Sequence, residues 1–158
     1  MTYIEEIKNN PGVLPKVVVS IYRFGYRTRN IFFLYIIWKI IDTIFCKLFL
    51  NCEFSAKLEC GKGLIINPPY GIVINQEAVI GKNVSIRHQV TIGEKNGVSP
   101  TIGDNVDISM GAKIIGGITI GNNCVIGANA VVTKSFPDNS ILAGVPARII
   151  KRREHTNA

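Results

Sequence analysis

Aliphatic residues recur at every sixth position through most of this 158-residue sequence. The recurrence begins near residue 54, reaches residue 132, and slips only in segments 67–70 and 93–100, whose composition is typical of loops. A period of six with recurrent glycine predicts a parallel β-helix, in which three repeats close one coil and coils stack about 4.8 Å apart. The repeated position holds Phe54, Cys60, Ile66, Ile74, Ile80, Ile86, Ile92, Ile102, Ile108, Ile114, Ile120, Ile126 and Val132.

The other columns of the repeat predict where each side chain points. Four residues after the aliphatic position the chain is apolar and mostly small, as at Val84 and Ala112, so this column can fill a narrow interior. The residue directly after the aliphatic position is often glycine, as at Gly81 and Gly103, which suits a chain that turns every six residues. His88 occupies a column too mixed for a core, so we expect it to face solvent or another subunit.

Residues 1–51 precede the repeat as a predicted helical leader, and residues 31–50 have the length of a membrane-spanning helix. Their polar residues form one helical stripe of Lys39, Asp42, Thr43, Cys46 and Lys47, and charges at the middle of a span are costly. We therefore expect an amphipathic helix that packs on the domain or a sister subunit, or lies on a membrane surface. A true span is the third alternative.

Charge and cysteine content limit the partners. The net charge of +7 favours anionic partners such as nucleotides, phosphates or acidic lipids. Nucleic acid is not expected, because basic residues are not interleaved with aromatics and no binding motif appears. No cleavable signal sequence is apparent, so we expect a cytoplasmic protein, peripheral on the inner membrane face if the leader contacts lipid. Cys46, Cys52, Cys60 and Cys124 lack metal-ligand spacing and are expected to be buried thiols, with no metal.

The repeats, the segment GIVINQEAVIGKNVSIRHQVTIG (71–93) and the closing AGVPARII (143–150) resemble the hexapeptide-repeat acyltransferases. The resemblance is to serine acetyltransferases and their relatives in polysaccharide-modifying pathways, and it covers roughly residues 52–151. It implies an all-β, left-handed parallel β-helix (52–137) with a cap and basic tail (138–158). It also implies a homotrimer that binds acetyl-coenzyme A between subunits, and a histidine that activates an acceptor hydroxyl for attack on the thioester.

The chain departs from serine acetyltransferases at two positions. Asn67 and Pro68 stand where that group typically carries an Asp-His pair, and Ser99 matches a second family histidine. The motif RHxVTIG, at residues 87–93, resembles enzymes that acetylate sugars of colanic acid and capsular polysaccharides. We therefore predict O-acetylation of a sugar hydroxyl in surface or capsular polysaccharide synthesis. Serine O-acetyltransferase is the enzymatic alternative, and a catalytically inactive β-helix scaffold or coenzyme A-binding module is the alternative of another class.

His88 is the predicted general base, because it lies in the same column as Pro68, one coil and about 5 Å along the axis. The alternative is a ring that only packs or forms a hydrogen bond at a subunit contact. Arg87 replaces the usual glycine, and we expect it either to hold a polar acceptor or to form a surface ion pair. Glu53 aligns with the family acidic residue that orients the base, although a solvated carboxylate is the simpler interpretation.

The resemblance also assigns the binding positions. Small residues allow the pantetheine arm to approach the coils, and cations near the last coil suit the nucleotide phosphates. The same residues also suit tight coils and a solubilising tail. The residues expected to contact coenzyme A are Ser109, Gly111, Ala112, Ala128, Lys134, Arg148 and Lys151, and those expected to contact the acceptor are Arg87, Asn67 and Tyr70.

Overall fold

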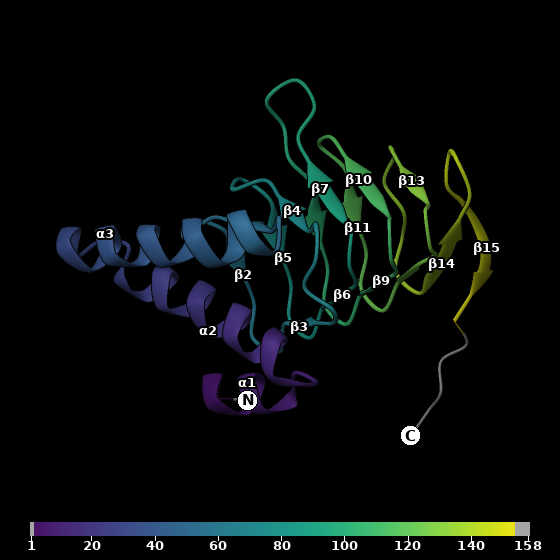
Figure 1. Ribbon diagram of the computed structural model, residues 1–158. Helices are drawn as coiled ribbons and strands as arrows, with labels where there is room; N and C mark the ends of the chain where they lie inside the picture. Colours follow the sequence, from purple (N-terminus) through teal and green to yellow (C-terminus); the bar gives the residue numbers. More distant parts are fainter. Residues whose placement is uncertain (1, 154–158) are drawn as a thin grey trace.

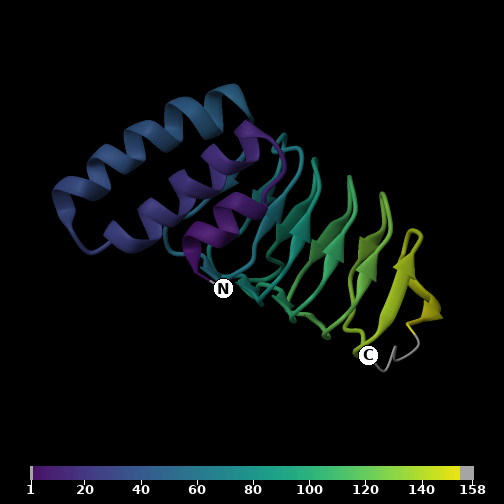
Figure 2. The same cartoon turned by 90° about the horizontal axis from the view of Figure 1, so that it is seen from below.

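The computed structural model describes residues 2–153, so His155 and the last five residues of the predicted tail lie outside the described part of the chain. Helices at the beginning of the chain cover one end of a stack of short strands (Figures 1 and 2). The helices are α1 (Tyr3–Asn9), α2 (Val13–Thr28), α3 (Phe32–Ile41) and the π-helix η1 (Asp42–Phe49). The strands are β1 (Glu53–Phe54), β2 (Glu59–Cys60), β3 (Ile65–Ile66), β4 (Val73–Ile74), β5 (Val79–Ile80), β6 (Ser85–Ile86), β7 (Thr91–Gly93), β8 (Thr101–Ile102), β9 (Asp107–Ile108), β10 (Lys113–Ile115), β11 (Thr119–Ile120), β12 (Val125–Ile126), β13 (Val131–Val132), β14 (Ser140–Ala143) and β15 (Arg148–Arg152).

The strands form the three faces of a parallel β-helix, which confirms the predicted fold. Sheet A has the order β1-β4-β7-β10-β13, sheet B the order β2-β5-β8-β11, and sheet C the order β3-β6-β9-β12-β14-β15. From β1 to β10, each strand pairs in parallel with the strand three positions later in the chain, as where Val73 pairs with Thr91, and β12 pairs in parallel with β14. The antiparallel β14–β15 pair covers the end of the stack opposite the helices (Figure 1).

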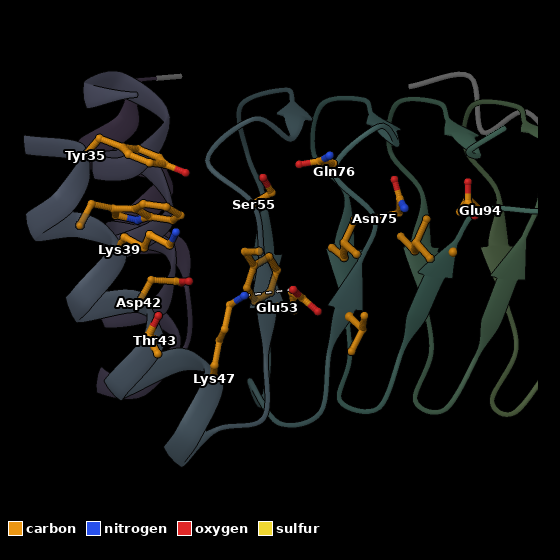
Figure 3. A pocket seen from close by; sticks show the side chains of 16 residues that line it. Tyr35, Lys39, Asp42, Thr43, Lys47, Glu53, Ser55, Asn75, Gln76 and Glu94 are labelled. Atoms are coloured by element: carbon orange, nitrogen blue, oxygen red, sulfur yellow. Dashed lines mark hydrogen bonds and ion pairs between the residues drawn. The ribbon is translucent and has the colours of Figure 1, made fainter. Parts of the chain in front are cut away.

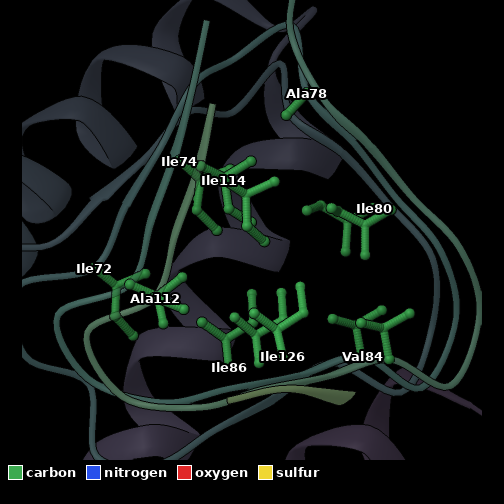
Figure 4. Close-up of a cluster of buried hydrophobic side chains, with 14 of the residues drawn as sticks. Ile72, Ile74, Ala78, Ile80, Val84, Ile86, Ala112, Ile114 and Ile126 are labelled. Atoms are coloured by element: carbon green, nitrogen blue, oxygen red, sulfur yellow. The ribbon is translucent and has the colours of Figure 1, made fainter. Parts of the chain in front are cut away.

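The aliphatic and small columns both point into the interior, as the sequence predicts. Figure 4 shows Ile74, Ile80 and Ile86 converging from different faces of the coil. Val84 and Ala112, from the small column, are completely buried beside them. One continuous apolar core therefore runs along the axis and fixes the direction of every outward side chain.

The turns between sheets B and C require glycine for a reason that the sequence analysis did not identify. A Cβ atom added to Gly81 would lie 2.5 Å from the carbonyl oxygen of Gly103 in the next coil. The left-handed backbone conformation occurs instead two residues later, at Asn83, Asn105 and Asn123, whose φ angles are 55°, 57° and 57°. Glycine therefore permits the close approach of coils, while asparagine makes the turn.

Side chains of the leader form hydrogen bonds with the backbone groups at the exposed edge of the first coil. The Glu6 carboxylate accepts a hydrogen bond from the Leu64 N–H at 2.7 Å, and Asn10 bonds to the backbone of Leu64 and Ile66. The buried Arg23 guanidinium pairs with Glu6 at 2.6 Å and donates to two carbonyl oxygens of the same coil. Side chains of α1, α2 and the adjoining Asn10 thus replace the strand partner that an edge would otherwise lack.

The segment predicted as one amphipathic helix, residues 31–50, forms α3 and η1 and packs on α2. Trp38 lies against Gly25, where a side chain would collide with the indole, and its Nε1 donates to the Ile21 carbonyl at 3.0 Å. Two residues of the polar stripe, Asp42 and Cys46, turn inward and are buried, whereas Lys39, Thr43 and Lys47 are exposed, and the apolar side also faces outward. Among residues 2–153, no helix combines the length and apolar character needed to cross a membrane.

Candidate active site

The turns that lead from sheet C to sheet A form one corner of the β-helix, which we call the C–A corner; it comprises residues 67–71, 87–90, 109–112 and 127–130. Backbone hydrogen bonds stack these turns. The Gly111 N–H donates to the His88 carbonyl at 3.0 Å, and the Asn129 N–H donates to the Met110 carbonyl at 2.9 Å. Most of the residues predicted for the site lie on this corner, namely Asn67, Tyr70, Arg87, His88, Ser109, Gly111, Ala112 and Ala128.

His88 is half-buried on this corner, and its Nδ1 atom is buried without a hydrogen-bond partner in the described part of the chain. The only other buried side-chain atom of this kind within residues 2–153 is Oδ1 of Asp107, in the strand that leads into the Ser109 turn. A buried polar atom without a partner is costly and therefore calls for an explanation. Both of these atoms belong to the segments that form the C–A corner.

The C–A corner also leaves backbone donors free. At the corner between sheets B and C, the N–H groups of Lys82, Asp104 and Asn122 each donate to a side chain of the next coil, at 2.7–2.8 Å. The equivalent N–H groups of His88 and Met110 donate to no acceptor within residues 2–153. One corner is thus closed by its own side chains, while the other leaves these two N–H groups without an acceptor in the described part of the chain.

Glu53 does not join His88. Its carboxylate pairs with Lys47 at 3.0 Å, and both side chains are about half exposed, at 56% and 44%. Glu53 lies on β1, two strands away from β7 in sheet A, and β7 begins three residues after His88. Glu53 therefore does not contact the imidazole within this chain, because the carboxylate and the ring lie on different coils, and its exposure agrees with the simpler interpretation of a solvated carboxylate.

One of the predicted coenzyme A contacts requires correction, that of the Ala112 side chain. The Ala112 side chain is fully buried and its N–H donates to the Ser109 carbonyl, because Ala112 belongs to the interior column. Lys134 follows β13 at the far end of sheet A, over the Phe136 ring. Arg148, by contrast, pairs with Ala143 at the end of β14 that leads toward the C–A corner. Lys151 lies further along β15, opposite Ile141.

The sequence analysis missed Lys113, which holds the turn after His88. Its Nζ atom donates to the Gln89 carbonyl at 2.7 Å and to the Thr91 hydroxyl at 3.1 Å. Lys113 stands directly before an aliphatic position, a column that is otherwise mixed and outward-facing. The only feature of the sequence that could have indicated this role is the residue type, because the paired positions in the neighbouring coils of sheet A hold threonine (Thr91) and valine (Val131).

A separate pocket of about 530 Å³ lies between the helices and sheet A (Figure 3). Lys39, Asp42 and Lys47 reach into it from the helices, opposite Glu53 and Asn75. Burial raises the pKa of Asp42, although its hydrogen bond with the Cys46 thiol and the Lys47 charge oppose the shift. Charged, polar and apolar side chains line the pocket, and none of them belongs to the C–A corner.

Comparison with known proteins agrees with the fold. Residues 99–134 match the bacterial transferase hexapeptide (six repeats) family. The chain is 38% identical to the serine acetyltransferase of Staphylococcus xylosus over 122 residues, which are 75% of this chain and 56% of that protein. A solved serine acetyltransferase in complex with CoA has a TM-score of 0.78 and 28% identity, covering 89% of this chain and 58% of that one. The solved Neisseria gonorrhoeae serine acetyltransferase in complex with serine has a TM-score of 0.77 and 27% identity, covering 92% of this chain and 66% of that one.

Residues 99–134 match the hexapeptide family, and the six-residue repeat and the three-faced β-helix agree with that match. Over its β-helix the chain is similar to serine acetyltransferases. It spans about half the length of the curated relatives that it matches, 56% and 52% for two of them.

Proposed function

We propose that this protein transfers an acetyl group from acetyl-coenzyme A to a hydroxyl group at the C–A corner. The observation that carries the proposal is the position of His88, half-buried beside backbone N–H groups that have no acceptor in the described part of the chain. With Nδ1 buried, the ring nitrogen farther from the backbone, Nε2, is the atom available to a substrate. The similarity to a serine acetyltransferase in complex with CoA supports coenzyme A as the carrier.

The chemistry needs one proton shuttle and no acyl-enzyme. The acceptor hydroxyl oxygen attacks the thioester carbonyl carbon while His88 Nε2 takes the hydroxyl proton. The tetrahedral oxyanion then collapses, the C–S bond breaks, and the departing thiolate takes the proton from the imidazolium. The products are an O-acetyl ester and free coenzyme A. Unpaired N–H groups such as that of Met110 are suitable donors to the oxyanion or to the amides of the pantetheine arm.

L-Serine is the acceptor that the comparisons favour. The most similar proteins described above are serine acetyltransferases, and one of the solved structures is a complex with serine. The sugar hydroxyl predicted from the sequence has no support from these comparisons. It stays a second candidate on one observation. Asn67 and Pro68 occupy the first turn of the C–A corner, where serine acetyltransferases typically carry an Asp-His pair, and neither side chain can act as a general base.

We further propose that the site is completed by a neighbouring subunit in a homotrimer. Two buried polar atoms, His88 Nδ1 and Asp107 Oδ1, have no partner within residues 2–153, and a second chain can supply one. Light scattering measures the assembly directly. A mass of three chains supports the arrangement, and a monomer that is active at assay concentration contradicts it.

The test of the proposed function is the release of coenzyme A thiol from acetyl-coenzyme A with L-serine and, separately, with sugar nucleotides and oligosaccharides. Turnover with serine supports the favoured acceptor, and turnover only with a glycan supports the second candidate. A calorimetric titration with coenzyme A accompanies the assay. Tight binding without turnover on any acceptor contradicts the transferase proposal and supports a binding module.

A further inference from the structure

One side of the α3–η1 helix is apolar and uncovered. Six large side chains on it, each more than half exposed, are Phe32, Phe33, Ile40, Ile44, Leu48 and Phe49, and we call them the apolar face. Their spacing places them along one continuous side of the helix. Phe32 and Phe49, at its two ends, are 80% and 76% exposed. Contiguous apolar surface of this size on a soluble domain marks an interaction site.

The orientation of the helix is the reverse of that in an ordinary surface helix. An amphipathic helix normally buries its apolar side and exposes its polar side. Here Asp42 and Cys46 are buried and Lys47 reaches into the pocket against sheet A. Packing within the chain therefore buries part of the polar stripe, and it leaves the apolar face uncovered.

The charges around the apolar face favour an anionic lipid surface as the partner. Two acidic residues of the leader, Glu6 and Asp42, are buried. Arg27 and Arg29 project at the turn just before Phe32, stacked over Tyr3 and Tyr26 at 4.3 Å each. The exposed charged residues of the described leader are Lys8, Arg27, Arg29, Lys39 and Lys47, against Glu5 alone.

A lipid surface fits this arrangement better than a second copy of the chain. A two-fold contact through the apolar face would bring the same cations of both copies together, which opposes association. Anionic headgroups instead neutralise cations that flank a buried apolar face. Lys39 lies at the boundary, since it lines both the pocket against sheet A and a shallow apolar groove with Ile36 and Ile40. Its long side chain can reach headgroups while its methylenes stay in apolar contact.

We propose that the apolar face inserts into the headgroup and acyl boundary of an anionic bilayer, and that Arg27, Arg29 and Lys39 contact lipid phosphates. The inference is independent of the proposed function, because it depends on none of the C–A corner residues. It makes the protein a peripheral membrane protein attached through its leader, with the β-helix outside the bilayer.

Flotation of the full chain with vesicles tests this proposal. The protein is expected to float with vesicles of phosphatidylcholine mixed with phosphatidylglycerol, to float less with phosphatidylcholine alone, and to detach as salt is raised. Replacing Phe32 and Phe33 with serine (Phe32→Ser/Phe33→Ser) should lower the partition coefficient at least about tenfold, because each phenyl ring loses its burial in lipid. Arg27→Glu/Arg29→Glu should reduce binding to anionic vesicles specifically.

The matched control is Ile149→Ser/Ile150→Ser, which removes two adjacent exposed apolar side chains at the opposite end of the molecule. It should float like the natural chain. Failure of the natural chain to float with either vesicle overturns the proposal, as does equal flotation of the phenylalanine variant. Another copy of the chain as the partner predicts a different outcome: the phenylalanine variant would have a lower mass in light scattering, and the natural chain would not bind vesicles. Circular dichroism checks that each variant is folded.

Discussion

The contact between the leader and the first coil predicts a large, specific loss of stability when Arg23 is replaced. Its guanidinium makes two hydrogen bonds to the Glu6 carboxylate, at 2.6 and 2.8 Å, and donates to the carbonyl groups of Cys60 and Gly61. Removing one partner of a buried ion pair leaves an uncompensated charge and costs about 3–5 kcal/mol. We expect Arg23→Met to lower the free energy of unfolding by about that amount.

Urea unfolding measures the loss, with two signals. The single tryptophan, Trp38, reports on the environment of α3, and far-ultraviolet circular dichroism, whose signal comes mainly from the helices, reports on the loss of helix in the leader as a whole. Arg27→Met is the control, since Arg27 lies one turn later on α2 and is exposed, so its loss should cost less than about 1 kcal/mol. The double variant Glu6→Gln/Arg23→Met should recover part of the loss, because it removes the unpaired charge. A loss for Arg23→Met as small as that of the control would refute this account of the leader.

Three further predictions concern burial and close packing. Burial raises the pKa of Asp42, so its contribution to stability is greatest below the ordinary carboxyl pKa of about 4 and is lost as the pH rises through the raised value. In urea titrations, Asp42→Asn should therefore be more stable than the natural chain at neutral pH but not at acid pH. An equal difference in stability at both pH values would contradict this. Burial raises the pKa of the Cys46 and Cys60 thiols to about 12. Both thiols should therefore react with Ellman's reagent at least about 100-fold more slowly in the native state than in urea. Rapid labelling of these thiols in the native protein would count against their burial. Gly81→Ala should lower the unfolding free energy by about 1–3 kcal/mol, since the new methyl group meets the Gly103 carbonyl; an unchanged urea midpoint would show that the coils can separate.

The interior of the β-helix was predictable because the direction of each side chain depends on local geometry. A coil of three six-residue repeats sends the aliphatic residue and the residue four places later inward, as Ile86 and Val90 show. His88, between them, is then directed outward regardless of what lies elsewhere in the chain. The position of His88 on the C–A corner follows from the repeat alone.

The leader could not be predicted in the same way, because its orientation depends on residues far away in the sequence. Glu6 bonds to Leu64, and Arg23 bonds to Cys60, contacts that no local pattern reveals. The polar stripe of the leader likewise does not reveal that Asp42 is buried against the β-helix. The partner of Glu53 could not be predicted for a related reason, since alignment along the chain does not reveal that Lys47 pairs with it.

The measurement that tests the central claim most directly is the rate of coenzyme A release by His88→Asn, compared with the natural chain on the acceptor that supports turnover. Asparagine fills similar space but cannot take the hydroxyl proton. We expect the turnover number to fall by about 10²–10⁴, while the dissociation constant of coenzyme A stays unchanged. A His88→Asn protein that transfers acetyl groups at the natural rate would contradict the assignment of His88 as the general base at the C–A corner.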